Sequence, residues 1–117
     1  MAYVDGFVLP VLKDKLALYK EKARVMGEIY KSHGAVNYVE CVADDVPYGE
    51  LTSFPRAVQV TPDEIVVFSW VTYESRQQRD AVNEKVMADP RMKSIFTELP
   101  VDGKRMIFGG FEQILQL

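Results

Sequence analysis

Apolar residues recur at intervals of three and four from Leu12 to His33, which is the spacing of one face of an α-helix. Charged residues, mostly lysines, occupy the positions between them. Gly34 follows, and a glycine just past the last turn is typical of a helix end. His33 falls in that last turn, where the helix dipole favours a positive charge. The pattern therefore predicts a long amphipathic helix that ends next to Gly34.

Segments rich in β-branched and aromatic residues predict four strands. The third, EIVVFSWVTY, carries apolar residues on both of its alternating faces, so we expect a central strand that is covered on both sides. In the last strand Gly109 and Gly110 suggest a bulge or the close approach of another backbone. The predicted strands are residues 3–11, 36–43, 64–73 and 106–115.

Two further helices follow the third strand. Ser75 is a suitable N-cap and Gln78 stands three residues later, as in a capping box, so a helix is expected from there to about Ala88. Asp89 and Pro90 then begin a second, short helix, because Asp is a good cap and Pro fits the first helical position.

The order strand, helix, strand, strand, helix, strand predicts an α+β fold of the ferredoxin-like βαββαβ type. Its antiparallel sheet carries the helices on one face, in one domain spanning residues 1–117. Residues 46–63 contain three prolines and a glycine, so we expect mostly loop, with one short ordered piece near residues 54–60. Loops of that length are often where function lies.

The predicted helices cover only one face of the sheet, and the other face is apolar too. Phe68 and Trp70 lie on one side of the third strand, whereas Val67 and Val71 lie on the other. Each large apolar side chain left in water forgoes roughly 1.5–3 kcal/mol. We therefore expect a homodimer, in which two chains pair through their open sheet faces into a dimeric α/β barrel.

Composition narrows the function classes. The chain has 117 residues, a formal charge of −3 and a pI near 5.1, which argues against nucleic-acid binding. One cysteine cannot form an internal disulfide, and one histidine cannot supply a multi-histidine metal site, so neither a metal nor another cofactor is expected. The opening residues lack a basic signal region, and no apolar run is long enough for a membrane span. These features predict a cytoplasmic protein with no membrane partner.

Four segments carry a family resemblance: YVDGFVLPV, VVFSWVTYESR, DAVNEKVMADPRM and KRMIFGGFEQIL. Together they resemble the YbaA-like family of small bacterial proteins, domain of unknown function 1428, in the dimeric α/β-barrel superfamily. The resemblance covers essentially the whole chain and implies a ferredoxin-like fold and a barrel dimer. It implies no reaction, although the superfamily includes cofactor-independent monooxygenases, haem-degrading enzymes, muconolactone isomerases and chlorite dismutases.

Several polar residues are candidates for a site. His33 is interpreted either as a general base or haem ligand, or as a helix-terminal residue that offsets the dipole. No carboxylate stands at a set spacing from it, and Glu40 on the adjacent strand is considered as a neighbour in space. Arg79 and Asn83 share one helix face, so they are either the polar groups of a pocket under the sheet or a solvated pair. Cys41 is interpreted as a small buried strand residue.

Aromatic residues suggest a pocket for a flat apolar molecule, or else simply core and dimer interface. No catalytic residue is assigned. The candidate ligand-binding residues are His33, Tyr38, Glu40, Phe54, Trp70, Tyr73, Arg79 and Asn83.

Three functions remain open from the residues. The first is a dimer that binds a small apolar or aromatic molecule between sheet and helices. The second is a cofactor-independent monooxygenase or isomerase, in which Trp70 and a tyrosine position the substrate and His33 or Glu40 moves a proton. The third is a structural or regulatory dimer that meets another protein, through a surface that includes residues 46–63. A cavity that contains His33 or Arg79 would favour the enzyme over the binding protein.

Overall fold

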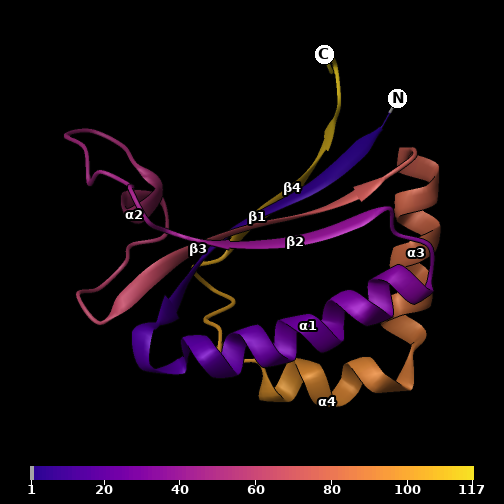
Figure 1. The fold of residues 1–117 in the computed structure, drawn as a ribbon, viewed down its shortest axis with the longest axis horizontal. Helices are drawn as coiled ribbons and strands as arrows, with labels where there is room; N and C mark the ends of the chain where they lie inside the picture. Colours follow the sequence, from indigo (N-terminus) through magenta and orange to yellow (C-terminus); the bar gives the residue numbers. More distant parts are fainter. Residues whose placement is uncertain (1) are drawn as a thin grey trace.

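A four-stranded antiparallel sheet lies over a layer of helices in the computed structural model, which describes residues 2–117 (Figure 1). The strands are β1 (Tyr3–Leu12), β2 (Asn37–Val42), β3 (Glu64–Tyr73) and β4 (Ile107–Glu112). Their order across the sheet is β2-β3-β1-β4, and each neighbouring pair is antiparallel. This order and the βαββαβ sequence of elements confirm the predicted ferredoxin-like fold.

Three helices lie on the same side of the sheet, namely α1 (Leu16–Ser32), α3 (Arg76–Ala88) and α4 (Pro90–Glu98). Of these, α1 and α4 run beneath the sheet and α3 lies at one end (Figure 1). The first helix begins later than its apolar pattern indicates, because β1 continues to Leu12 and a 3-10 turn, η1 (Lys13–Lys15), precedes it. Its predicted end is confirmed, since His33 is the C-cap residue and Gly34 adopts a φ of 111°.

The other helix boundaries also follow local capping signals. The Ser75 hydroxyl accepts the backbone N–H of Gln78, as predicted, but the Gln78 side chain reaches back to the N–H of Glu74, one residue before the N-cap, so only half of the expected capping box forms. Asp89 accepts the N–H of Arg91 at the start of α4. The short helix α2 (Phe54–Ala57) is the ordered piece expected within residues 46–63.

Strand register divides the side chains between two environments. On β1 and β3 the odd-numbered residues face the helices, where Val67, Val71 and Tyr73 are among the most buried side chains. The even-numbered residues face the other side, where Phe68 is 41 % exposed. We call this second side, with Phe68, Trp70, Ile107 and Phe111 on it, the open face.

The last strand differs from its prediction. β4 is shorter than the expected 106–115, and its ladder continues through Gly109 and Gly110, which pair with Gly6 and Asp5. The expected bulge is therefore wrong. The close approach at Gly110 comes from a side chain instead, because a Cβ there would collide with the Tyr3 hydroxyl.

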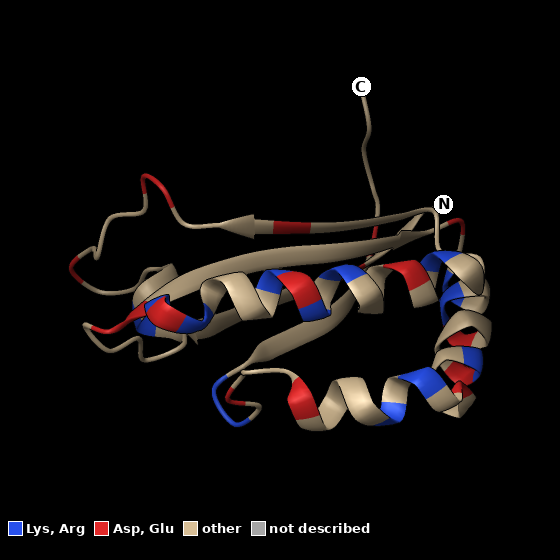
Figure 2. Ribbon diagram, turned by 60° about the horizontal axis from the view of Figure 1, so that its bottom comes forward, with Lys and Arg blue, Asp and Glu red and all other residues tan. Residues whose placement is uncertain are grey.

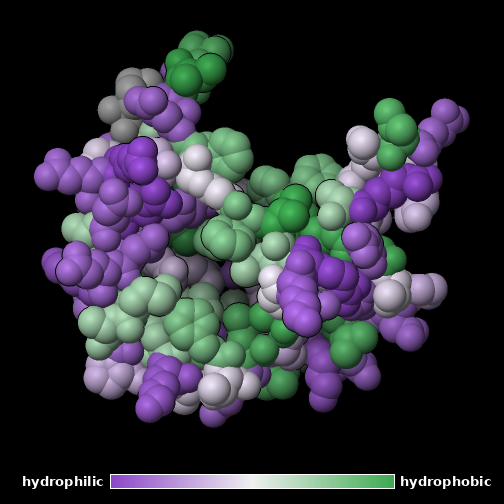
Figure 3. All heavy atoms as spheres, turned by 180° about the vertical axis from the view of Figure 1, so that it is seen from behind, coloured by the Kyte–Doolittle hydropathy of each residue, from purple (hydrophilic) through white to green (hydrophobic). Residues whose placement is uncertain are grey.

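Polar and apolar side chains are segregated over the surface. Charged residues gather on the outward faces of the helices, whereas most of the sheet is free of them (Figure 2). Seen from behind, hydrophobic residues are exposed across the middle of the molecule (Figure 3). Among residues 2–117, every helix is either too short or too polar to cross a membrane.

Cys41 lies on the open-face side of β2, opposite Phe68, and is exposed. The interpretation of a buried cysteine is therefore wrong for the single chain. The physical reason is that β2 is an edge strand and that α2 covers only the part of the open face around Val8 and Val66.

Candidate ligand-binding site

A cavity of about 420 Å³ lies between the sheet and the helices. Phe7 and Leu9 of β1 and Val71 of β3 form its sheet side, because the odd-numbered residues of these strands point toward the helices. Met26 and Tyr30 of α1 line the opposite side. The residues that enclose the cavity are thus mainly aromatic and aliphatic.

The cavity is bordered by exposed apolar side chains on the side of α4 and β4. Phe96 is 52 % exposed and Phe108 is 70 % exposed, and Met87 from the end of α3 is exposed beside them. Leu99 and Val101, in the segment between α4 and β4, complete this border. We call this border the mouth of the cavity. Molecules that reach the cavity first meet an apolar surface.

Glu40 is the one acidic residue that lines the cavity, within residues 2–117. Its Oε1 accepts a hydrogen bond of 2.7 Å from the Tyr19 hydroxyl, and its Oε2 accepts one of 2.9 Å from the Tyr38 hydroxyl. The Ser69 side chain lies near this carboxyl as well and favours its ionised form. Three neutral hydroxyl groups from α1, β2 and β3 therefore converge on a single carboxylate.

Burial and hydrogen bonding act in opposite directions on Glu40. Burial raises the pKa of its carboxyl, while the three hydroxyl donors favour the ionised form and limit the rise. Burial and the neighbouring carboxylate also raise the pKa of Tyr19 and of Tyr38 far above the ordinary value, so both phenols keep their protons and donate them. The result is a carboxylate held by neutral donors in an apolar cavity.

A glycine in the middle of α1 lets Tyr38 reach this position. A Cβ at Gly27 would lie 2.7 Å from Cδ1 of Tyr38, so only glycine allows the ring to pack against the helix there. The ring centroids of Tyr38 and Tyr30 are 5.7 Å apart. The helix backbone and one neighbouring ring thus fix the phenol that binds Glu40.

Arg79, Asn83 and Tyr73 belong to a second polar cluster, outside the cavity. Nη1 of Arg79 lies 2.7 Å from Oδ1 of Asp5, whose side chain is 10 % exposed. The Tyr73 hydroxyl lies near Asp5 and donates to Oδ1 of Asn83 at 3.4 Å. The helix face with Arg79 and Asn83 does lie over the sheet, but Arg79 pairs with Asp5 there, and neither Arg79 nor Asn83 lines the cavity.

His33 joins the end of α1 to the start of α4. Its Nε2 lies 2.7 Å from Oδ2 of Asp89, and Arg91 binds the same carboxylate. The Arg91 guanidinium and His33 hold the pKa of Asp89 well below its usual range. His33 therefore pairs with Asp89 and not with Glu40, and it is not a cavity residue.

Phe54 and Trp70 lie with the open face. The ring of Phe68 is 5.8 Å from that of Phe54 and 5.5 Å from that of Trp70, in edge-to-face arrangements. Trp70 borders the cavity as well, between Ser69 and Val71 on β3, but strand alternation puts its side chain on the open face. Of the eight candidate residues, the structure thus brings together only Tyr38 and Glu40 as polar groups of the cavity.

The sequence reasoning missed Tyr19, Tyr30 and Ser69. Both tyrosines stand in the apolar stripe of the first helix, where a hydroxyl on a buried face is the signal of a polar partner. Ser69 is the polar residue between Val67 and Val71 on the helix-facing side of β3. These three signals were visible in the sequence, but none of them identifies Glu40 as the shared partner. Among residues 2–117, no group of three or more His, Cys, Asp or Glu side chains is placed to hold a metal ion.

The sheet order, the helices on one face and the cavity between the layers define a protein of the ferredoxin-like α+β class. The chain belongs to the family described as "Protein of unknown function (DUF1428)", whose model matches residues 2–103. It is 51 % identical over 115 residues to the protein named "Uncharacterized protein YbaA" in Escherichia coli, with 98 % of both chains covered. A protein of the same name in Shigella flexneri matches with the same identity and coverage.

Solved structures with this fold have diverse descriptions. SnoaB, a cofactor-independent oxygenase from Streptomyces nogalater, superposes with a TM-score of 0.62 at 11 % identity, covering 98 % of this chain and 96 % of that one. An uncharacterised NIPSNAP domain protein from Burkholderia xenovorans gives a TM-score of 0.61 at 13 % identity, with 96 % and 94 % covered. A dimeric ferredoxin-like protein from an uncultured marine organism gives 0.52 at 11 % identity, with 95 % and 92 % covered. At such identities the likeness shows the fold alone.

Proposed function

We propose that the protein binds a small apolar or aromatic molecule in the cavity between its sheet and its helices. The observation that carries this proposal is the cavity itself, with aromatic and aliphatic walls and one carboxylate at Glu40. Its volume of about 420 Å³ lies in the range of small-molecule sites, and so does its combination of apolar lining with few polar groups. His33 and Arg79 do not line it, which favours binding over catalysis.

A neutral fluorescent probe, N-phenyl-1-naphthylamine, tests the proposal. We expect saturable enhancement of its fluorescence with one site per chain. Met26→Trp fills the cavity from α1 and is expected to weaken binding about tenfold or more. Val25→Trp adds the same side chain at the neighbouring exposed position and is expected to leave binding unchanged. Binding by the Met26 variant that equals the wild type would overturn the proposal, provided that circular dichroism shows both variants folded.

A proton-transfer enzyme is the second candidate, and Glu40 is the observation that favours it. A carboxylate whose pKa is raised by burial is a stronger base than one in water, and this one faces an apolar cavity. Oxygen uptake with a panel of polyphenols would reveal a cofactor-independent oxygenase. Turnover that is lost in Glu40→Gln and kept in His33→Ala would identify Glu40 as the base.

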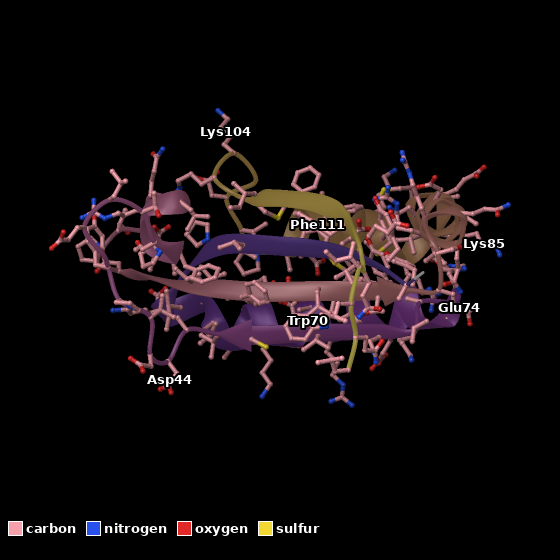
Figure 4. All side chains as sticks on the ribbon, turned by 90° about the horizontal axis from the view of Figure 1, so that it is seen from above. Asp44, Trp70, Glu74, Lys85, Lys104 and Phe111 are labelled. Atoms are coloured by element: carbon pink, nitrogen blue, oxygen red, sulfur yellow. The ribbon has the colours of Figure 1, made fainter. Side chains whose placement is uncertain are left out.

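We further propose that two chains pair through the open face. The apolar side chains exposed there support this arrangement, since Phe111 is 65 % and Ile107 is 46 % exposed. Figure 4 shows Trp70 and Phe111 over the sheet, with the labelled charged residues Asp44, Glu74, Lys85 and Lys104 at the periphery. An apolar centre with a charged rim is the usual anatomy of a protein interface.

Light scattering after size exclusion tests the pairing. At micromolar concentration we expect twice the chain mass of 13.3 kDa. Phe111→Lys places a charge on the open face and is expected to give the single-chain mass. Leu18→Lys, on the helix layer, is the matched control and keeps the dimer. A wild-type protein of single-chain mass would contradict the proposal.

A further inference from the structure

The hydrogen bonds around Glu40 determine what the cavity can offer a ligand. An ionised carboxylate has about four acceptor positions and no donor. Tyr19 and Tyr38 each take one of these positions. About two acceptor positions of the carboxylate therefore remain for other partners.

The same hydrogen bonds use up the two phenol donors of the site. A hydroxyl group has one proton, and the protons of Tyr19 and Tyr38 are both directed at Glu40. Toward a ligand, these two phenols present only the lone pairs of their oxygens. The Glu40 carboxylate and the phenol oxygens of Tyr19 and Tyr38 thus act together as hydrogen-bond acceptors.

The remaining lining adds no donor of positive charge. Within residues 2–117, no lysine, arginine or histidine lines the cavity. Arg79 and Arg105, the arginines on either side, pair with Asp5 and with Glu64 and Asp102. An anion in this cavity would be repelled by the charge of Glu40, and no cation would compensate for the loss of its hydration.

We propose that the cavity selects molecules with a hydrogen-bond-donating head, namely a hydroxyl or amino group on a flat apolar body, and rejects carboxylates and heads that only accept. This selectivity rests on the proposed function, because it concerns the same cavity. The donor head binds at Glu40 beside the two phenols. The apolar body extends from there toward Phe96 and Phe108 at the mouth.

Three naphthalenes of similar shape test the selectivity on the full chain. 2-Naphthol has a donor, 2-methoxynaphthalene only accepts, and 2-naphthoate carries a negative charge. By isothermal titration calorimetry at neutral pH, we expect the Kd of 2-naphthol to be at least about tenfold lower than that of 2-methoxynaphthalene. A hydrogen bond to a charged acceptor contributes a difference of that size. We expect 2-naphthoate to bind most weakly.

Glu40→Gln is the informative variant, because an amide keeps the shape but replaces one acceptor with a donor. We expect it to bring the affinities for 2-naphthol and 2-methoxynaphthalene within about threefold of each other. Glu84→Gln, an exposed position on α3, is the matched control and keeps the wild-type preference. Ser69→Ala removes the third hydroxyl near the carboxylate without removing its charge, so the preference for 2-naphthol survives there too.

The outcomes separate this inference from the function on which it rests. If none of the three compounds binds, the binding function itself is wrong. If all three bind equally, or if 2-naphthoate binds best, the cavity binds ligands but the donor selectivity is wrong. A preference for 2-naphthol that persists in Glu40→Gln would likewise contradict the role given to Glu40.

Discussion

Two carboxylates on the helix-facing side of the sheet differ in how their charge is met. Asp5 lies 2.7 Å from Arg79, so its charge is neutralised inside the fold. Glu40 has only neutral hydroxyl partners, and its charge stays available to the cavity. Burial raises the pKa of both carboxyls. The contrast assigns Asp5 to the structure and Glu40 to the site. A buried charge without a charged partner destabilises the folded protein, so its presence indicates a functional role.

Glu40→Gln should therefore stabilise the protein at neutral pH. Because the pKa of Glu40 is raised in the folded state, the folded chain loses stability as pH rises from the ordinary carboxyl value through the raised one. The amide removes that cost, so we expect Tm to rise by about 2–5 °C at neutral pH. The gain should vanish in acid, where the wild-type carboxyl is protonated. Thermal unfolding at several pH values, with Glu84→Gln as control, measures this, and a large drop in Tm would show that Glu40 holds the fold together.

Sequence separation explains which site residues could be predicted. Tyr38 and Glu40 are neighbours on one face of a strand, so their proximity follows from the two-residue period. The partner of Arg79 is 74 residues away, and that of His33 is 56 residues away. The periodicity of a helix does not reveal a partner so far away in the sequence. The sequence therefore could not show that Arg79 and His33 form ion pairs instead of lining a pocket.

At the scale of elements, α1 both covers the sheet and shapes the cavity. Its predicted stripe supplied Tyr19, Met26 and Tyr30, and its one glycine admits the ring of Tyr38. Caps and strand periods are local signals, so the element order and most boundaries were predictable from the sequence. The absence of a side chain at Gly27 matters only because the ring of Tyr38 packs there, and the sequence alone does not show that contact.

Gly27→Ala should damage the site while improving the helix. Alanine is favoured over glycine by about 1 kcal/mol in a helix interior, but the added methyl would collide with the ring of Tyr38. We expect the ring to shift, so that the Tyr38–Glu40 hydrogen bond is lost and probe affinity falls about fivefold or more. Gly6→Ala, on the open face, where an added Cβ comes no closer than 3.9 Å to its neighbour, is the matched control. Unchanged affinity in the Gly27 variant would show that the position of Tyr38 does not matter for binding.

The segment between α4 and β4 is held by one arginine. Arg105 donates from Nη1 and Nη2 to the two oxygens of Glu64, at 2.7 and 2.6 Å, and from Nε to Asp102. The same segment supplies Leu99 and Val101 to the cavity. An ion pair at the start of β3 thus fixes part of the wall of the site.

Arg105→Gln should lower Tm at neutral pH, and the loss should shrink in acid. Arg105 holds the pKa of Glu64 at about 2, below its ordinary value near 4.5. The stabilisation is therefore complete above the ordinary value and is lost as pH falls toward the lowered one. We expect the Tm difference from wild type to narrow across that window. A difference that stays constant with pH would mean that Arg105 acts through packing alone. Arg24→Gln, at an exposed pair on α1, is the control.

At the scale of the whole molecule, one sheet serves two purposes through strand alternation. The residues of β1 and β3 that face the helices form the core and the cavity, and those that face away form the open face. The apolar character of both faces was visible in EIVVFSWVTY. A partner that covers the face without helices could therefore be predicted along with the fold. Which face holds the cavity was not visible, because it depends on how far the helices stand from the sheet.

Because the sheet and helices of a single chain already enclose the cavity, we expect binding to survive the loss of pairing. Phe111→Lys is expected to separate the chains, yet its side chain lies on the opposite side of the sheet from Glu40. We therefore expect this variant to bind N-phenyl-1-naphthylamine with one site per chain and a Kd within about twofold of the wild type. Titrations at several protein concentrations, with Leu18→Lys in parallel, provide the measurement. A loss of affinity that follows the loss of dimer mass would show instead that the partner chain completes the site.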